Sequence, residues 1–219
     1  MTAVDDHRPP ASPHSLRHRG GRALWGLVQG TLFRWSPRPC HRWRNRLLRL
    51  FGARLHPTAR VYPRARVWAP WNLEMAAFAT VADDVDVYAV DRIRLGERSI
   101  VSQYAFLCGA THDFELEHRP LVPAPIEVGD RAWIAADVFV GPGARIGAGT
   151  VVGARSSVFG DLPPGMVCVG SPARPVRPVR MKDVGGATAA TDAPSAADEP
   201  VPAPPRDSPA TQGRAEPAA

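Results

Sequence analysis

A histidine and an aspartate lie inside the longest interruption of an otherwise regular sequence. The interruption, "FLCGATHDFELEHRPLVPAPIEVGDRAW" (Phe106–Trp133), contains His112 and Asp113. An imidazole gains and loses its proton near neutral pH, so a histidine held here can take the proton of a reacting hydroxyl group. A loop histidine can also lack any chemical role, which is what we expect of His118. Which of the two applies to His112 depends on the elements that hold it.

Aliphatic residues recur at every sixth position on both sides of this interruption. They are Leu55, Val61, Val67, Met75, Val81, Val87, Leu95, Val101, Leu107, Val128, Ile134, Val140, Ile146, Val152 and Val158. A small residue usually follows four positions later, as at Ala59, Ala65, Ala79, Ser99, Ala105, Thr111, Ala132, Ala144, Thr150 and Ser156. This hexapeptide repeat is typical of a parallel β-helix, in which the fourth residue must be small because it points into a narrow interior.

The steps that differ from six residues fall after every third turn. They are Val67 to Met75, Val87 to Leu95 and Leu107 to Val128. The repeat therefore closes into coils with three sides, and every insertion lies at the same corner. We predict an all-β domain over residues 55–180 with about five coils: 55–72, 75–92, 95–112, 128–145 and 146–163. In this arrangement His112 ends the third coil, and residues 113–127 form a loop at that corner.

The chain before the repeat is basic and amphipathic. Most of the net charge of +6 originates here, because fourteen arginines and no acidic residue lie between Asp6 and Glu74. We expect residues 1–20 to be a disordered basic arm and residues 21–54 to form two helices that are broken at Ser36–Pro39. Their apolar faces comprise Leu24, Leu27, Val28 and Leu32 in the first helix and Trp43, Leu47, Leu50 and Phe51 in the second.

Two interpretations of these helices remain open. They can pack on the end of the β-helix, or they can lie on an anionic membrane surface with arginines at the phosphates. The apolar run 23–33 is about half a membrane span and lacks a small-residue cleavage site, so we expect no export. Three distant cysteines that form no pair motif favour a protein of the cytoplasm, which the second interpretation would place at the inner face of the membrane. Residues 181–219, rich in Pro and Ala, are expected to be a disordered tail.

The repeat resembles that of the hexapeptide-repeat acyltransferases, whose fold is a left-handed parallel β-helix. Among these the chain is most similar to O-acetyltransferases of colanic acid and exopolysaccharide biosynthesis. The similarity is carried by "VYPRARVWAPWNLEM" (Val61–Met75), "THDF" (Thr111–Phe114), "VGDRAWIAADVFVGPGARIGAGTVVGARSSVF" (Val128–Phe159) and "VGSPARPVR" (Val169–Arg177). It implies transfer of an acetyl group from acetyl-CoA to a sugar or lipid-linked saccharide, by a homotrimer and without a metal.

The resemblance also implies roles for single residues. His112 would be the general base, and Trp133, Asp113 and Tyr88 would contact the acceptor. Acetyl-CoA would be held by the following set: Ala136, Ala154, Arg155, Arg174 and Arg177. Trp133 and His112 fall at different corners, about 16 Å apart for a side of five residues. A site that uses both would therefore lie between two subunits.

Two departures and several alternatives qualify this interpretation. Relatives carry an asparagine near the position of Ala89 and a lysine at Gly160, so the acceptor and the affinity for CoA are open. An N-acetyltransferase acting on an amino sugar or another small acceptor, or a non-catalytic β-helix scaffold, would fit the same repeat. A zinc-dependent carbonic anhydrase is disfavoured because His56, His112 and His118 lack a suitable spacing. No nucleic-acid-binding module is recognised in the arginine-rich segment, so we expect no nucleic acid partner.

Overall fold

The structure, a computed structural model, describes residues 16–180 of the chain, with side chains from residue 18 onward. The rest of the predicted arm and the predicted tail lie outside the described residues. The helical part begins at Leu16, five residues before the predicted boundary, and consists of two α-helices joined by one π-helical turn. These are α1 (Leu16–Val28), η1 (Gln29–Phe33) and α2 (His41–Leu50). A 3-10 turn, η2 (Pro70–Asn72), lies within the coils.

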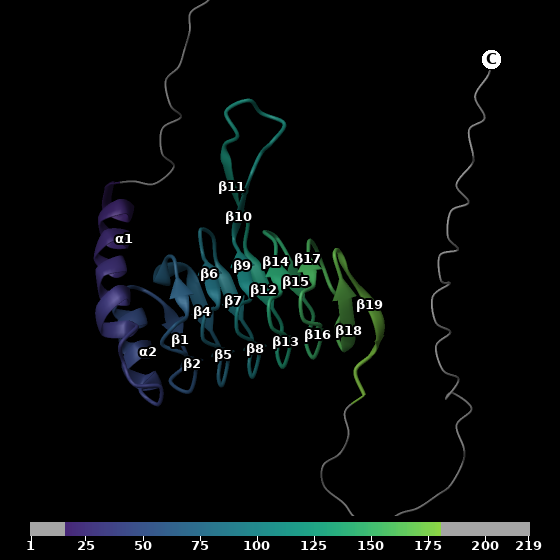
Figure 1. The fold of residues 1–219 in the computed structure, drawn as a ribbon, viewed down its shortest axis with the longest axis horizontal. Helices are drawn as coiled ribbons and strands as arrows, with labels where there is room; N and C mark the ends of the chain where they lie inside the picture. Colours follow the sequence, from purple (N-terminus) through teal and green to yellow (C-terminus); the bar gives the residue numbers. More distant parts are fainter. Residues whose placement is uncertain (1–15, 181–219) are drawn as a thin grey trace, which may run out of the picture. The chain divides into compact units, whose positions relative to one another are not determined.

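Short parallel strands stack into three sheets, which form the three walls of the coils (Figure 1). Wall A consists of β1 (Arg54–Leu55), β4 (Leu73–Met75), β7 (Ile93–Leu95), β12 (Ile126–Val128) and β15 (Arg145–Ile146). Wall B consists of β2 (Arg60–Val61), β5 (Thr80–Val81), β8 (Ile100–Val101), β13 (Trp133–Ile134), β16 (Val151–Val152), β18 (Met166–Gly170) and β19 (Ala173–Pro178). Wall C consists of β3 (Arg66–Val67), β6 (Asp86–Tyr88), β9 (Phe106–Cys108), β14 (Phe139–Val140) and β17 (Ser157–Val158). The predicted three-sided parallel β-solenoid is confirmed.

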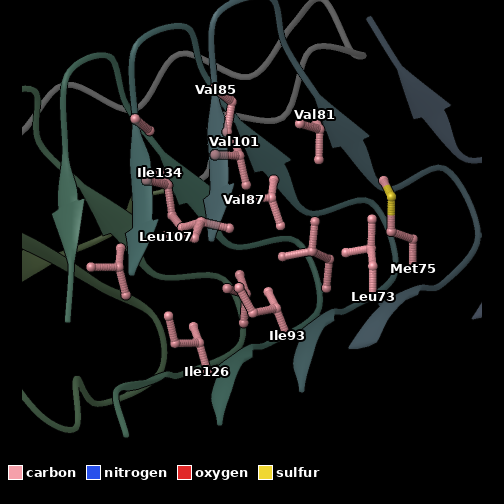
Figure 2. Packing of buried hydrophobic residues seen from close by; sticks show 14 of the residues in the cluster. Leu73, Met75, Val81, Val85, Val87, Ile93, Val101, Leu107, Ile126 and Ile134 are labelled. Atoms are coloured by element: carbon pink, nitrogen blue, oxygen red, sulfur yellow. The ribbon is translucent and has the colours of Figure 1, made fainter. Parts of the chain in front are cut away.

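The core consists of side chains from the repeat positions, which lie in register from coil to coil. Each of the fifteen predicted aliphatic residues is at most 7% exposed. On wall B, for example, Val81 pairs with Val101, and Val101 pairs with Ile134. Figure 2 shows the resulting interior, in which branched side chains from all three walls pack together. Burial of this continuous apolar column drives the stacking of coils that could not fold singly.

The small residues four positions later are also buried, with one exception. Thr111 was predicted to point inward, but it is exposed because the chain has already left the wall at Ala110. Stacking is close at Gly129, where an added Cβ would lie 2.6 Å from the backbone nitrogen of Ala148. A side chain at that position would have to separate two coils.

The repeat continues beyond the five predicted coils into an incomplete sixth turn. Leu162 forms a parallel bridge with Ile146 of wall A, and Cys168 pairs with Val152 on wall B and is fully buried. The antiparallel strand β19 then pairs with β18 and ends the sheet.

The helices cover the first coil, whose strands β1, β2 and β3 lie at the open edge of each wall. Such edges leave backbone groups unpaired, and these groups need a partner. We call residues 16–50 the helical cap. Side chains of the helical cap bond to five backbone groups of the first coil. Trp25 Nε1–H donates to Val67 O (2.6 Å), and Val67 N–H donates to Gln29 Oε1 (2.9 Å). From α2, three side chains donate to carbonyl oxygens: Arg44 Nε–H to Val61 O (2.7 Å), Asn45 Nδ2–H to Ala59 O (2.7 Å) and Arg49 Nη2–H to Leu55 O (2.6 Å). Of the two interpretations, packing on the β-helix is therefore observed.

The face that packs agrees only in part with the face chosen from the aliphatic pattern, since Val28, Leu47 and Phe51 do pack on the core. Trp25 and Phe33 are buried, whereas Leu24, Leu27 and Leu32 are exposed. The rings of Trp25 and Phe33 meet edge to face with centroids 5.8 Å apart, so aromatic contacts hold the first helix of the cap, and Leu47 and Leu48 are buried beneath the second. No helix among the described residues is long and apolar enough to span a membrane.

Candidate active site

A β-hairpin that projects from the coils carries His112. Its strands are β10 (Ala110–His112) and β11 (Leu121–Pro123), and they pair antiparallel with His112 opposite Leu121. The hairpin leaves after β9 of wall C and returns into β12 of wall A, as Figure 1 shows. His112 therefore lies on the hairpin, four residues beyond Cys108, where β9 ends, and not on the third coil as predicted. The insertion point itself agrees with the corner expected from the spacing.

One hydrogen bond determines which imidazole nitrogen of His112 is free. The ring Nδ1 lies 2.6 Å from the backbone carbonyl oxygen of Arg119. Because a carbonyl oxygen can only accept, Nδ1 carries the proton, and the neutral ring keeps its lone pair on Nε2. His112 is exposed, and Nε2 has no partner among the described residues. The arrangement is that of an oriented base whose accepting nitrogen faces outward.

Asp113, the residue after His112, stabilises a turn in the hairpin loop. Its carboxylate accepts a hydrogen bond from Glu115 N–H (3.0 Å), and its own N–H donates to Pro120 O (3.0 Å). An aspartate that bonds to the backbone two residues later forms a local turn. This turn closes the loop whose Arg119 carbonyl orients His112. The predicted contact of Asp113 with the acceptor stays a prediction.

The thiol at the root of the hairpin is not prepared to act as a nucleophile. Cys108 donates from Sγ to Ala110 O at 3.2 Å. Burial raises the pKa of the Cys108 thiol, so it stays protonated at neutral pH. A covalent acyl-cysteine intermediate at this place is therefore disfavoured, and direct transfer to the acceptor is favoured.

Tyr88 lies one coil before the hairpin, directly beneath its root. Its carbonyl accepts from Gly109 N–H at 2.9 Å, and a Cβ on Gly109 would approach that oxygen to 2.7 Å. The ring of Tyr88 belongs to a row of aromatic side chains along wall C, with centroids 5.3 Å from Trp68 and 6.3 Å from Phe106. The structure thus brings Tyr88 near the base of the element that carries His112.

Trp133 begins β13 on wall B and lines a groove. Its indole N–H donates to Ser102 Oγ at 2.9 Å, which fixes the ring while leaving it about half exposed. The groove has a volume of about 540 Å³ and lies where walls A and B meet. Its lining comprises Glu97, Asp130, Arg131, Trp133, Ala148, Gly149, Val151, Gly165 and Val179. His112 is not part of this lining, so within one chain the structure does not bring the two predicted residues together.

The predicted CoA residues Ala136 and Ala154 lie on successive coils at the corner between walls B and C. Arg155 N–H donates to Ala136 O at 3.0 Å, which ties the two turns together. The amide N–H groups of both alanines have no hydrogen-bond partner among the described residues. Arg155 forms only an exposed ion pair with Asp137 (3.4 Å), an interaction worth little in water.

Arg174 and Arg177 lie on β19, which brings Arg174 beside this corner, whereas Arg177 lies opposite Val167, toward the other edge of wall B. Val169, the strand partner of Arg174, packs against Gly153, the residue before Ala154. Both guanidinium groups are exposed and bond only to backbone carbonyls of adjacent residues, Ala173 and Pro178. They are thus available for an anionic ligand. Gly160, where relatives carry a lysine, has open space around the position of a Cβ.

Metal ligation receives no support from the described residues. They contain no group of three histidine, cysteine, aspartate or glutamate side chains that could hold an ion. His56, one of the three histidines considered above, bonds through Nδ1 to Thr58 Oγ1 at 2.8 Å.

Comparison with known proteins decides the family. No family model matches the chain. WcaF of Escherichia coli K12, described as an acetyltransferase of colanic acid biosynthesis, is 46% identical over 163 residues, which are 73% of this chain and 90% of WcaF. The chain belongs to the hexapeptide-repeat acetyltransferases. The galactoside O-acetyltransferase of E. coli is 31% identical over 107 residues, which are 48% of this chain and 50% of that protein.

Solved structures of this family have the same fold. A maltose O-acetyltransferase of Clostridium difficile 630 superposes with a TM-score of 0.66 at 25% identity, covering 74% of this chain and 88% of that one. A hexapeptide-repeat acetyltransferase of Vibrio cholerae, crystallised with acetyl coenzyme A, superposes with a TM-score of 0.68 at 24% identity and coverages of 76% and 91%. As a hexapeptide-repeat acetyltransferase, the protein is an acyltransferase.

Two residues beside the candidate site were missed from the sequence. Asn72 places a side-chain amide next to Ala89, and its Nδ2 donates to Ala89 O (3.0 Å) and Val90 O (2.8 Å). Arg119 contributes through its backbone carbonyl, which no residue-type pattern reveals. Asn72 could have been found by counting one coil back along the same corner.

Proposed function

We propose that the protein transfers the acetyl group of acetyl-CoA to a sugar hydroxyl in the biosynthesis of a surface polysaccharide or exopolysaccharide, with His112 as general base. The observation that carries the proposal is the hydrogen bond from His112 Nδ1 to Arg119 O, which leaves Nε2 free and exposed. The similarity to WcaF and to galactoside O-acetyltransferase supports the reaction and the class of acceptor.

The residues suit a direct transfer. Nε2 of His112 takes the hydroxyl proton as the sugar oxygen attacks the thioester carbonyl, and the resulting oxyanion needs a backbone N–H donor. The tetrahedral intermediate then breaks its carbon–sulfur bond, and the leaving thiolate recovers the proton from the imidazolium. Ala136 and Ala154 have free amide groups for the pantetheine arm, and Arg155, Arg174 and Arg177 suit the phosphates.

We further infer that the site is completed by a second subunit of a homotrimer. Trp133 and Ile100 are exposed on wall B, and Phe114, Leu116 and Val122 are exposed on the hairpin. Contact between these two apolar surfaces within one chain is prevented because the hairpin leaves at the opposite corner. If the hairpin of one subunit covers wall B of the next, His112 reaches the groove beside Trp133, and both apolar surfaces become buried.

The decisive experiment measures transfer from labelled acetyl-CoA to a panel of sugars, amino sugars and lipid-linked oligosaccharides. His112→Ala should lower kcat by about two to four orders of magnitude, because the base is lost, with little change in KM for acetyl-CoA. His118→Ala, which changes an exposed histidine of the same loop, should retain full activity.

Unchanged turnover by His112→Ala would refute the mechanism. Acetylation of nitrogen rather than oxygen across the panel would replace the proposed O-acetyl transfer by N-acetyl transfer. Absence of transfer to every acceptor would favour the scaffold alternative.

A further inference from the structure

The helical cap has a second apolar face, which points away from the coils. Its members are Leu24, Leu27, Leu32, Trp35, Trp43 and Leu50, and all are exposed, Trp35 to 82% and Leu50 to 79%. The face is continuous between the helices, because Trp43 Nε1–H donates to Leu32 O at 3.1 Å. Trp43 and Leu50 lie seven residues apart on α2 and so share one side of that helix. We call these six residues the outer apolar face.

The inner face of the same helices already fixes the cap to the first coil. Trp25, Phe33, Leu47 and Leu48 are buried there. The outer apolar face is therefore not needed for folding, and it is presented in a defined geometry. Single exposed apolar side chains are common on protein surfaces, but six large ones on the same outward surface form a patch. Such patches mark interaction sites.

The charges around this face are uniformly positive. Arg34, Arg42 and Arg46 are exposed and pair with no acidic side chain among residues 16–180. On α2 the arginines line a hollow of about 320 Å³, whose walls comprise Arg42, Asn45, Arg46, Arg49, Pro57 and Thr58. Three guanidinium groups around one small hollow suit a phosphate group, which accepts several charge-assisted hydrogen bonds.

We propose that the outer apolar face is a docking surface for a bilayer that contains anionic phospholipids. The leucines and tryptophans enter the boundary between headgroups and acyl chains, and lipid phosphates bind at the hollow formed by Arg42, Arg46 and Arg49. Arginines beside exposed leucine and tryptophan on amphipathic helices are the combination that interfacial helices use. A second copy of the chain is a poorer occupant, because self-association of this face would bring like charges together.

Docking of this kind places the enzyme where a lipid-linked saccharide would be found. The first coil faces the membrane through the cap, and the hairpin with His112 follows two coils later along the solenoid. The docking does not depend on the chemistry of transfer, so each can be tested without the other.

Cosedimentation of the full chain with vesicles tests the proposal. We expect binding to vesicles of phosphatidylcholine with three tenths phosphatidylglycerol and little binding to phosphatidylcholine alone. Arg42→Gln/Arg46→Gln should weaken partitioning by about thirtyfold, which corresponds to about 1 kcal/mol for each charge at an anionic surface. The matched control Arg54→Gln/Arg66→Gln removes the same charge from exposed wall residues and should bind within about threefold of the parent protein.

The apolar part is tested separately by Leu27→Gln/Leu32→Gln/Trp35→Gln. This variant should lose binding even at low salt, while its circular dichroism melt and its acetyl transfer to a soluble sugar stay those of the parent protein. Failure of the parent protein to bind anionic vesicles, or equal binding by the arginine variant and its control, would overturn the proposal. A change of oligomeric mass in the triple variant would show that a second copy occupies the face instead.

Discussion

His112 is oriented by a backbone carbonyl and not by a carboxylate. A carbonyl holds the ring and its tautomer, but it does not stabilise the imidazolium with a full negative charge. Asp113, the nearest acidic residue in sequence, uses its carboxylate on Glu115 N–H. His112 can therefore accept a proton and return it to the leaving thiolate, which suits direct acetyl transfer without an acyl-enzyme.

A second prediction for a single residue is that Arg174 affects the binding of acetyl-CoA but not the chemical step. Arg174→Gln should raise KM for acetyl-CoA about tenfold and leave kcat within about twofold, because a charge-assisted contact to a phosphate far from the thioester contributes to binding only. Initial rates over a range of acetyl-CoA concentrations measure both constants. Arg180→Gln, at an exposed residue beyond β19, is the control. An equal fall in kcat for Arg174→Gln would contradict a role limited to binding.

At the scale of elements, the repeat was predictable and the cap face only in part. A buried position at every sixth residue is visible in the sequence itself, because each coil must fill the same narrow interior with a side chain of similar size. The hairpin was placed at the right corner but begins at Ala110, since nothing in "CGATHDF" distinguishes the last wall residue from the first hairpin residue. Trp25 was overlooked because burial of the cap depends on where the first coil presents Val67, which is information from another element.

For the candidate site, too, residue types could be chosen from the sequence, whereas contacts between distant segments could not. His112, Trp133 and the predicted CoA residues were proposed from residue type and position in the repeat, and a resemblance supplied their roles, which stay predictions. The Arg119 carbonyl and the Asn72 amide were not found, because each acts through a contact that depends on how the hairpin or the preceding coil folds. A backbone acceptor in particular leaves no residue-type signal.

The attachment of α2 to the first coil is predicted to depend on pH. Burial lowers the pKa of His41, with further lowering by Arg44, Arg60 and Arg38 and partial opposition from the hydrogen bond to Val61 O. Since the folded pKa lies below the unfolded value of about 6.5, this stability is fully present above that pH and is lost as the pH falls through the folded pKa.

Melting temperatures between pH 7.5 and pH 5 measure this effect. The parent protein should lose more stability on acidification than His41→Gln, which cannot take up the proton. Equal pH slopes for the two proteins would show that His41 does not contribute.

At the scale of the whole molecule, the proposed active site combines residues that one chain holds apart. Wall B presents Trp133, and the hairpin with His112 leaves between walls C and A. Mixed trimers distinguish a shared site from a site within one chain. His112→Ala and Trp133→Ala should each be nearly inactive as homotrimers, because each lacks one half of every site.

Coexpressed in equal amounts, the two variants should form mixed trimers in which one site of three receives both intact halves, so the separated mixed trimers should recover about a third of the parent activity. The measurement compares initial rates of the mixed trimers, separated by two affinity tags, with those of each homotrimer. The parent protein carrying the same tags is the control. No recovery in the mixed trimers would mean that His112 and Trp133 do not act in one site across the subunit boundary.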